Sequence, residues 1–395
     1  MIPYGKQAIS ENDVAAVAEV LRSDFLTCGP EIEAFEAEFA AMVGAKHAVA
    51  VSNATAALHL AMLVAKIGSG DRVVTSPNTF VASANCAAFV GATPDFCDID
   101  SKTYNICPEA LARDWQDDTK AVIAVAYAGQ SADMPAIAEI AHSRGSIVIE
   151  DGCHGTGGGF SYKGKDYKIG GHPWADITTF SFHPVKTMTT GEGGILVTDN
   201  DQYAQTARLL RGHGITRDEK EFTGLGSDEP HLAERGPWYY EMQSLGFNYR
   251  ITDFQCALGR SQLKKLPDFI KRRQEIVAEY NKAFSDLPWL TTPAVSDEKN
   301  RNTISWHLYT VLIDFDQLGK TRAEVMYELR AKGVGSQVLY IPVHLQPWYR
   351  ETYGYTAGKC PNAESYYSNA LSLPLYPLMS DSDVKKVVSA VKSLI

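Results

Sequence analysis

The sequence predicts an α/β fold, with a large domain built on a mainly parallel sheet and a smaller α+β domain after it. Three observations support this prediction. At 395 residues the chain is long enough for two domains. Up to about residue 200, short apolar runs alternate with helical patterns, which is typical of parallel strands whose connecting helices cover both faces of a sheet. Beyond residue 300, strand and helix patterns are mixed.

The individual elements follow from the spacing of apolar residues. Ile32, Phe35 and Phe39 recur at helical spacing, so residues 31–43 are expected to form an amphipathic helix. We place the large domain at 1–250, and the linking helices and small domain at 251–395. Further helices are expected at 55–66, 79–90, 134–144, 253–266, 269–284 and 322–332, and strands at 47–51, 72–75, 121–126, 146–150, 195–198, 307–313 and 336–340.

Composition and charge narrow the function classes. A net charge of -10 argues against a general nucleic-acid binder, because affinity for phosphate backbones comes from clustered Lys and Arg. No apolar run approaches the roughly 20 residues of a membrane span, and the N-terminus does not resemble a secretion signal. The seven scattered cysteines form no C-x-x-C pair, so we expect a reducing, cytoplasmic location and no metal site.

Lys186 is the most informative residue of the chain. It lies between a Ser/His/Pro turn and a glycine-rich bend, where a cleft could remove its solvation and leave a nucleophilic amine. Asp151 follows the apolar run 146–150. A reactive lysine and a strand-end carboxylate are what pyridoxal phosphate (PLP) requires, one to bond its aldehyde and the other to hold its ring nitrogen protonated. An ordinary surface lysine is the alternative for Lys186 alone.

Other polar or aromatic residues also follow predicted strands. Residues 52–55 (Ser-Asn-Ala-Thr) open a helix and could hold a phosphate, although the same pattern is an ordinary helix cap. Phe80 could stack on a flat ring or belong to the core. His154 could orient a cofactor or Asp151, and Ser181 could add a hydroxyl to a phosphate site. We expect the polar segment 213–238 to be a mobile surface loop, with ligand contact as the alternative.

The motifs SNATAALH, SPNTFVASAN, EDGCHGTGG, FSFHPVKTMTTGEGG, GFNYRITDFQCALGRSQLKKL and YIPVHLQ resemble, in this order, the DegT–StrS family of sugar aminotransferases. The resemblance covers nearly the whole chain. It implies the type I fold of PLP-dependent aminotransferases, with a seven-stranded, mainly parallel sheet, and a homodimer with shared active sites. FLTCGPEIEAFE and VAYAGQSADM are most similar to the pseudaminic-acid pathway enzymes, which aminate UDP-2-acetamido-2,6-dideoxy-β-L-arabino-hexos-4-ulose at C4.

The resemblance also implies a role for each matching residue. Lys186 would bond the cofactor aldehyde and Asp151 would face its ring nitrogen, which makes both catalytic. Cofactor contacts are implied for His154 at the ring hydroxyl, Phe80 on the ring face, Ala54, Thr55 and Ser181 at the phosphate, and Asn248 from the neighbouring subunit. Substrate contacts are implied for Tyr4, Asp24, Phe25, Leu26, Thr27, Gln337, Val338, Leu339 and Tyr340, together with Ala54, Ser181 and Asn248.

The expected reaction moves an amino group from an amino acid, L-glutamate by family analogy, to a nucleotide-linked 4-keto-6-deoxy sugar. Two alternatives stay open: another C3 or C4 sugar aminotransferase, such as the GDP-perosamine type, and a non-catalytic regulatory protein on the same fold. Related dehydratases carry histidine in place of the lysine, so Lys186 argues against dehydration. Gly152 and Cys153 depart from the small apolar residues that the family usually has after the Asp.

Overall fold

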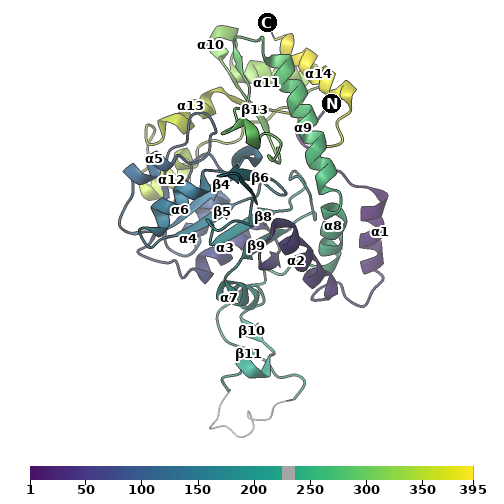
Figure 1. The fold of residues 1–395 in the computed structure, drawn as a ribbon, viewed down its shortest axis with the longest axis vertical. Coiled ribbons are helices and arrows are strands. Elements are labelled where there is room, and N and C mark those ends of the chain that lie inside the picture. Colours follow the sequence, from purple (N-terminus) through teal and green to yellow (C-terminus); the bar gives the residue numbers. More distant parts are fainter. Residues whose placement is uncertain (225–235, 395) are drawn as a thin grey trace.

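The computed structural model describes residues 1–224 and 236–394. Figure 1 shows a central sheet between helices, a C-terminal unit near which both chain ends lie, and an arm that projects from the opposite end of the molecule. None of the helices in these residues has the length and hydropathy that crossing a membrane requires.

The central sheet has seven strands in the order β1-β9-β8-β5-β4-β2-β3. Strand β9 runs antiparallel to its neighbours β1 and β8, and the other adjacent pairs are parallel. The predicted fold class and the mainly parallel seven-stranded sheet are therefore confirmed. The strands are β1 (His47–Val51), β2 (Arg72–Thr75), β3 (Thr93–Phe96), β4 (Thr119–Val125), β5 (Ile147–Asp151), β8 (Ile177–Ser181) and β9 (Gly194–Thr198).

Helices cover both faces of this sheet. Because side chains alternate along a strand, Val49 and Val51 pack with α3, α4 and α7 on one face, whereas Ala48 and Ala50 pack with α2 and α8 on the other. Helices α5 and α6 complete the second face. The bounds are α2 (Pro30–Val43), α3 (Ala54–Val64), α4 (Ala82–Phe89), α5 (Pro108–Arg113), α6 (Met134–His142), α7 (Asp201–Arg211) and α8 (Asp253–Leu263), and α1 (Glu11–Val20) packs against α8.

The long helix α9 (Leu266–Phe284) leads into the C-terminal unit, where β12, β13 and β14 form an antiparallel sheet. Tyr280, Tyr309, Val325 and Val387 belong to one buried core that joins α9, this sheet, α11 and α14. The large-domain and small-domain limits at residue 250 stay a prediction. The bounds are β12 (Leu290–Thr291), β13 (Tyr309–Ile313), β14 (Ala370–Leu373), α10 (Phe315–Leu318), α11 (Arg322–Ala331), α12 (Pro347–Tyr353), α13 (Pro361–Asn369) and α14 (Asp381–Lys392).

The predicted strand at 336–340 is wrong. Within this segment only Gln337 forms a β-bridge, with Ser372. The Leu339 carbonyl instead accepts a hydrogen bond from the Tyr127 hydroxyl at 2.7 Å, and the Tyr340 hydroxyl lies 3.1 Å from His154. Contacts with side chains of the sheet domain thus replace the pairing that a strand would need.

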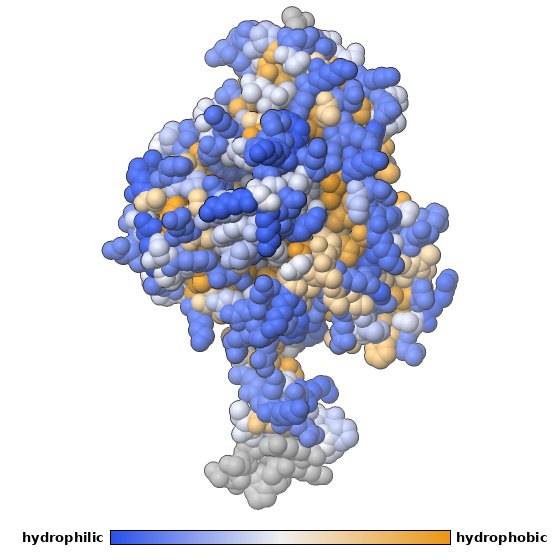
Figure 2. Space-filling view, viewed as in Figure 1, coloured by the Kyte–Doolittle hydropathy of each residue, from blue (hydrophilic) through white to orange (hydrophobic). Residues whose placement is uncertain are grey.

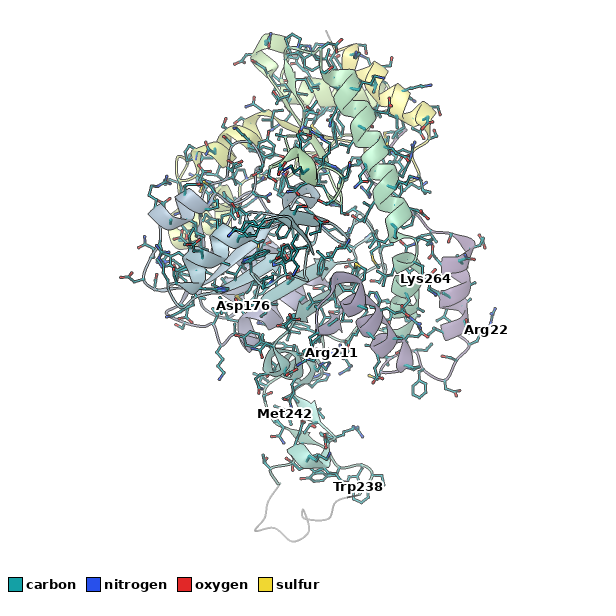
Figure 3. All side chains as sticks on the ribbon, in the orientation of Figure 1. Arg22, Asp176, Arg211, Trp238, Met242 and Lys264 are labelled. Atoms are coloured by element: carbon teal, nitrogen blue, oxygen red, sulfur yellow. The ribbon has the colours of Figure 1, made fainter. Side chains whose placement is uncertain are left out.

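The arm comprises β10 (Ile215–Thr216), β11 (Glu241–Met242) and the residues around them. Trp238 and Met242, which Figure 3 labels, lie on it with largely exposed side chains. Part of the predicted loop 213–238, residues 225–235, lies outside the described residues. A smaller hairpin, β6 (Gly159–Tyr162) with β7 (Lys165–Lys168), follows β5.

Candidate active site

The candidate site lies at the carboxyl edge of the central sheet. Strand β5 ends at Asp151 and β8 ends at Ser181, and the residues after β1 lead directly into α3. Parallel strands bring these ends to one edge, where open α/β sheets bind their ligands. A cavity of about 620 Å³ opens there, and Asp151, Ser181 and Lys186 all line it. Its size fits a small-molecule cofactor.

A turn after β8 places Lys186 in the wall of this cavity. The Phe182 N–H donates to the Gly193 carbonyl at 2.9 Å, and the Lys186 N–H donates to the His183 carbonyl at 2.9 Å. Burial lowers the pKa of Lys186 below its ordinary value, and the charge of Asp151 opposes this effect. In the described parts of the chain, the Lys186 amine has no hydrogen-bond or ion-pair partner. The amine is therefore free to react with a molecule in the cavity.

Asp151 is buried on the same cavity and is held by two donors. The Ser83 hydroxyl donates to its Oδ2 at 2.7 Å, and the Cys153 N–H donates to its Oδ1 at 3.1 Å. The preceding residue, Glu150, points to the opposite face of the strand and accepts a hydrogen bond from the Gly170 N–H at 3.0 Å. Asp151 thus presents a fixed carboxylate to a ligand.

His154 is neutral and does not bond Asp151 in the described structure. Its Nδ1 accepts a hydrogen bond from the Ala128 N–H at 3.3 Å, so the ring proton is on Nε2, which donates to the Tyr340 hydroxyl at 3.1 Å. Burial, with a smaller contribution from the Lys186 charge, holds the pKa of His154 well below its ordinary value. A neutral imidazole at this place orients Tyr340.

The N-terminus of α3 offers a place for an anion. The Asn53 side chain caps this helix by accepting from the Ala56 N–H at 2.9 Å, and Ala54 and Thr55 line the cavity. Backbone N–H groups and the helix dipole favour a phosphate at such an end. Gly194 is needed beside it, because a Cβ at that position would lie 2.5 Å from the Ala54 nitrogen. Ser181 lines the same cavity.

Four further predicted residues line this cavity, namely Phe80, Tyr340, Tyr4 and Leu339, and three predicted segments do not. Phe80 has a ring 58% exposed at the cavity and 6.2 Å from the Tyr340 ring, and Tyr4 and Leu339 add to the wall. Among the residues that lie elsewhere, Asp24 and Phe25 line a separate cavity of about 700 Å³ between α1 and α8. Leu26, Thr27, Gln337, Val338 and Asn248 also lie outside the Lys186 cavity of the same chain.

Several lining residues were not found from the sequence: Thr79, Ser83, Val125, Cys153, His183 and Glu192. Ser83 follows Thr79 by four residues, and both lie in the same motif as Phe80. This shared motif is the sequence feature that could have indicated them.

Residues 7–392 match the DegT/DnrJ/EryC1/StrS aminotransferase family. SpsC of Bacillus subtilis, a spore coat polysaccharide biosynthesis protein, is 42% identical over 395 residues, which span all of this chain and 97% of SpsC. The chain belongs to this family. It is a sugar aminotransferase, and the enzymes of the family depend on PLP.

Solved structures agree with this assignment. PseC of Helicobacter pylori, an aminotransferase of pseudaminic acid biosynthesis, has a TM-score of 0.87 and 29% identity, with 100% of this aminotransferase and 98% of PseC covered. Spr1654 of Streptococcus pneumoniae was solved in a PMP form, with a TM-score of 0.88, 28% identity and coverage of 100% and 99%. A PLP form of Spr1654 has a TM-score of 0.87, 27% identity and coverage of 100% and 98%.

The cavity of this aminotransferase fits pyridoxal phosphate. An unpaired amine and a fixed carboxylate line the cavity. The N-terminus of α3, which includes Thr55, and the Ser181 hydroxyl at the end of β8 line it as well. These are the groups that the aldehyde, ring nitrogen and phosphate of the cofactor require.

Proposed function

We propose that the protein binds PLP and transfers an amino group from L-glutamate to C4 of a nucleotide-linked 4-keto-6-deoxy sugar. The unpaired Lys186 amine in one cavity with Asp151 carries the proposal. The sugar that we propose is UDP-2-acetamido-2,6-dideoxy-β-L-arabino-hexos-4-ulose, which the likeness to PseC supports. The higher identity to SpsC favours, as a second candidate, another nucleotide keto sugar that serves polysaccharide synthesis.

Each residue has a distinct task in this proposal. Bound PLP supplies an aldehyde that exchanges amino groups and a protonated ring that withdraws electrons. The Lys186 amine would hold the cofactor through its aldehyde and would accept and return the proton that moves during the exchange, a task that its lowered pKa favours. The Asp151 carboxylate would hold the protonated nitrogen of the ring. The α3 N-terminus and the hydroxyls of Thr55 and Ser181 hold the phosphate.

A panel of sugars tests the proposed substrate. With glutamate as donor, UDP-linked 4-keto sugars are expected to give the highest kcat/KM among UDP-, GDP- and dTDP-linked 4-keto and 3-keto sugars, as measured by mass spectrometry and NMR of the products. The Lys186→Ala protein in the same assays controls for contaminating enzymes. Preferred amination of a 3-keto sugar would contradict the C4 assignment, and preference for GDP or dTDP would contradict the proposed nucleotide.

The protein is further proposed to act as a homodimer with shared active sites. Asn248 is exposed at the base of the arm, where it bridges to Gly212, so its proposed phosphate contact requires the cavity of a second copy. Exposed apolar side chains occur on the arm and at Phe25 and Leu26, and Figure 2 shows an apolar band on an otherwise mainly hydrophilic face. Such surfaces favour a partner chain. A cytoplasmic location stays a prediction, supported by seven cysteines without disulfides.

Mixing two inactive variants tests the shared site. Lys186→Ala chains and Asn248→Ala chains, each expected to lose at least about tenfold in activity, are unfolded together and refolded. If Asn248 acts across the dimer, half of the mixed dimers' sites are intact, and activity should recover to about a quarter of wild type. Mixing the folded variants without unfolding is the control. No recovery after co-refolding would place Asn248 in its own chain's site or outside both.

A further inference from the structure

The carboxylate of Asp151 is held by a buried chain of hydroxyl groups to which the proposed function assigns no role. Ser83 on α4 donates to Oδ2 at 2.7 Å, and the Thr79 hydroxyl lies 2.8 Å from the Ser83 hydroxyl. Ser83 is 1% exposed and Thr79 is 2% exposed. Solvent therefore does not compete for these bonds, and each is stronger than it would be in water.

The direction of this chain is fixed by chemistry. A carboxylate has no proton to donate, so the proton between Ser83 and Asp151 belongs to the serine hydroxyl. Because that proton is committed to Asp151, the Ser83 oxygen accepts its second hydrogen bond from Thr79. The order is Thr79 to Ser83 to Asp151, and each donation strengthens the next.

Hydrogen bonds donated to a carboxylate stabilise its charged form and fix its orientation. On the basis of the proposed PLP function, we propose that Ser83, supported by Thr79, is a positioning residue that holds the Asp151 carboxylate in place as the acceptor for the N–H of the cofactor ring. The proton between the two then stays on the ring nitrogen, where it is needed for the ring to withdraw electrons. Ser83 also fixes the carboxylate in the orientation that faces the cavity.

The neutral state of two buried thiols beside Asp151, those of Cys86 and Cys153, supports the proposed role of Ser83. Burial, together with the Asp151 charge, raises the pKa of Cys86 to about 12 and holds the pKa of Cys153 well above its ordinary value. Both thiols therefore stay neutral at physiological pH. Neither adds a second negative charge that would compete with the carboxylate for the ring proton, so the hydroxyl chain acts on a single anion.

The test measures the ring nitrogen directly. Wild type, Ser83→Ala and Thr79→Val are loaded with PLP labelled with ¹⁵N in the ring, and the ¹⁵N chemical shift is recorded by NMR. In Ser83→Ala the signal is expected to move toward that of unprotonated pyridine, and kcat/KM is expected to fall about tenfold or more, since a hydrogen bond to a charged group is lost. Thr79→Val should move the signal the same way by less.

Ser146→Ala is the matched control. Ser146 is also a buried serine whose hydroxyl donates at 2.7 Å, to the Thr119 carbonyl, but it lies at the other end of β5 from Asp151. Its ring-nitrogen signal should equal that of wild type. An unshifted signal in Ser83→Ala, or the same shift in Ser146→Ala, would overturn the role of Ser83 while leaving the proposed function intact. A wild-type protein that binds no PLP would overturn the proposed function and this inference together.

Discussion

Replacing Lys186 with alanine is expected to lower the rate of amino transfer by at least about 1000-fold, because the change removes both a nucleophile and a general base. The cofactor should still bind, since the α3 N-terminus and Asp151 are unchanged. Borohydride treatment followed by peptide mapping should attach the cofactor to Lys186 in wild type and to no residue in the variant. Steady-state assays with glutamate and a keto sugar measure the rate.

Two control variants show whether the effect comes from the Lys186 amine itself. One keeps the positive charge at this position, and the other removes a lysine elsewhere. Lys186→Arg retains a cation but cannot bond the aldehyde, so it should be as slow as the alanine variant. Lys168→Ala removes an exposed lysine on β7 and should match wild type. An active Lys186→Arg protein would show that only a positive charge is needed there, and the proposed role of the amine would be wrong.

Asp151→Asn should slow the reaction by roughly 100-fold or more while PLP binding remains measurable. Asparagine has the same shape but no charge, so the ring nitrogen loses the anion that keeps it protonated and the electrostatic stabilisation of the reacting state falls. Stopped-flow absorbance after addition of glutamate measures this half of the reaction without any sugar. A deficit is therefore expected even when the glutamate half-reaction is measured by itself.

Glu150→Gln is a matched control for this variant. Glu150 is the preceding residue of the same strand and is also buried, but it bonds the Gly170 N–H and His172 on the other face. Its substitution should leave the glutamate half-reaction unchanged and lower thermal stability. If both variants slow the half-reaction equally, the effect of Asp151→Asn arises from the strand and not from the carboxylate.

Local sequence was sufficient for much of the sheet and for the centre of the site. Apolar runs identify β1, β4, β5 and β9, and the residues just beyond such runs meet at one edge because the strands are parallel. Strand β3 was not found, because Thr93–Phe96 contains Pro and Asp and pairs only with β2 at the end of the sheet. Strand β8 was also not predicted, although its β-branched residues Thr178 and Thr179 favour a strand.

Contacts between distant segments were not predictable in the same way. Val338, Leu339 and Tyr340 have the composition of a strand, but bonds to Tyr127 and His154 determine their conformation. Ser83 occurs in a run of small residues typical of a packed helix, and its partner Asp151 is 68 residues away. No local pattern relates the two. The positions of 24–27 and Asn248 outside the Lys186 cavity likewise became visible only when the chain was folded.

The wall that carries Tyr4 has a consequence for folding. Ile2 pairs with Val334, the Gly335 N–H donates to the Ile2 carbonyl at 2.8 Å, and the Leu375 N–H donates to the Tyr4 carbonyl at 3.1 Å. The segment around Tyr4 thus pairs with segments far later in the chain, although the sheet between them can already have folded. Completion of this wall of the cavity is therefore a late step in folding, because it depends on contacts of long sequence separation.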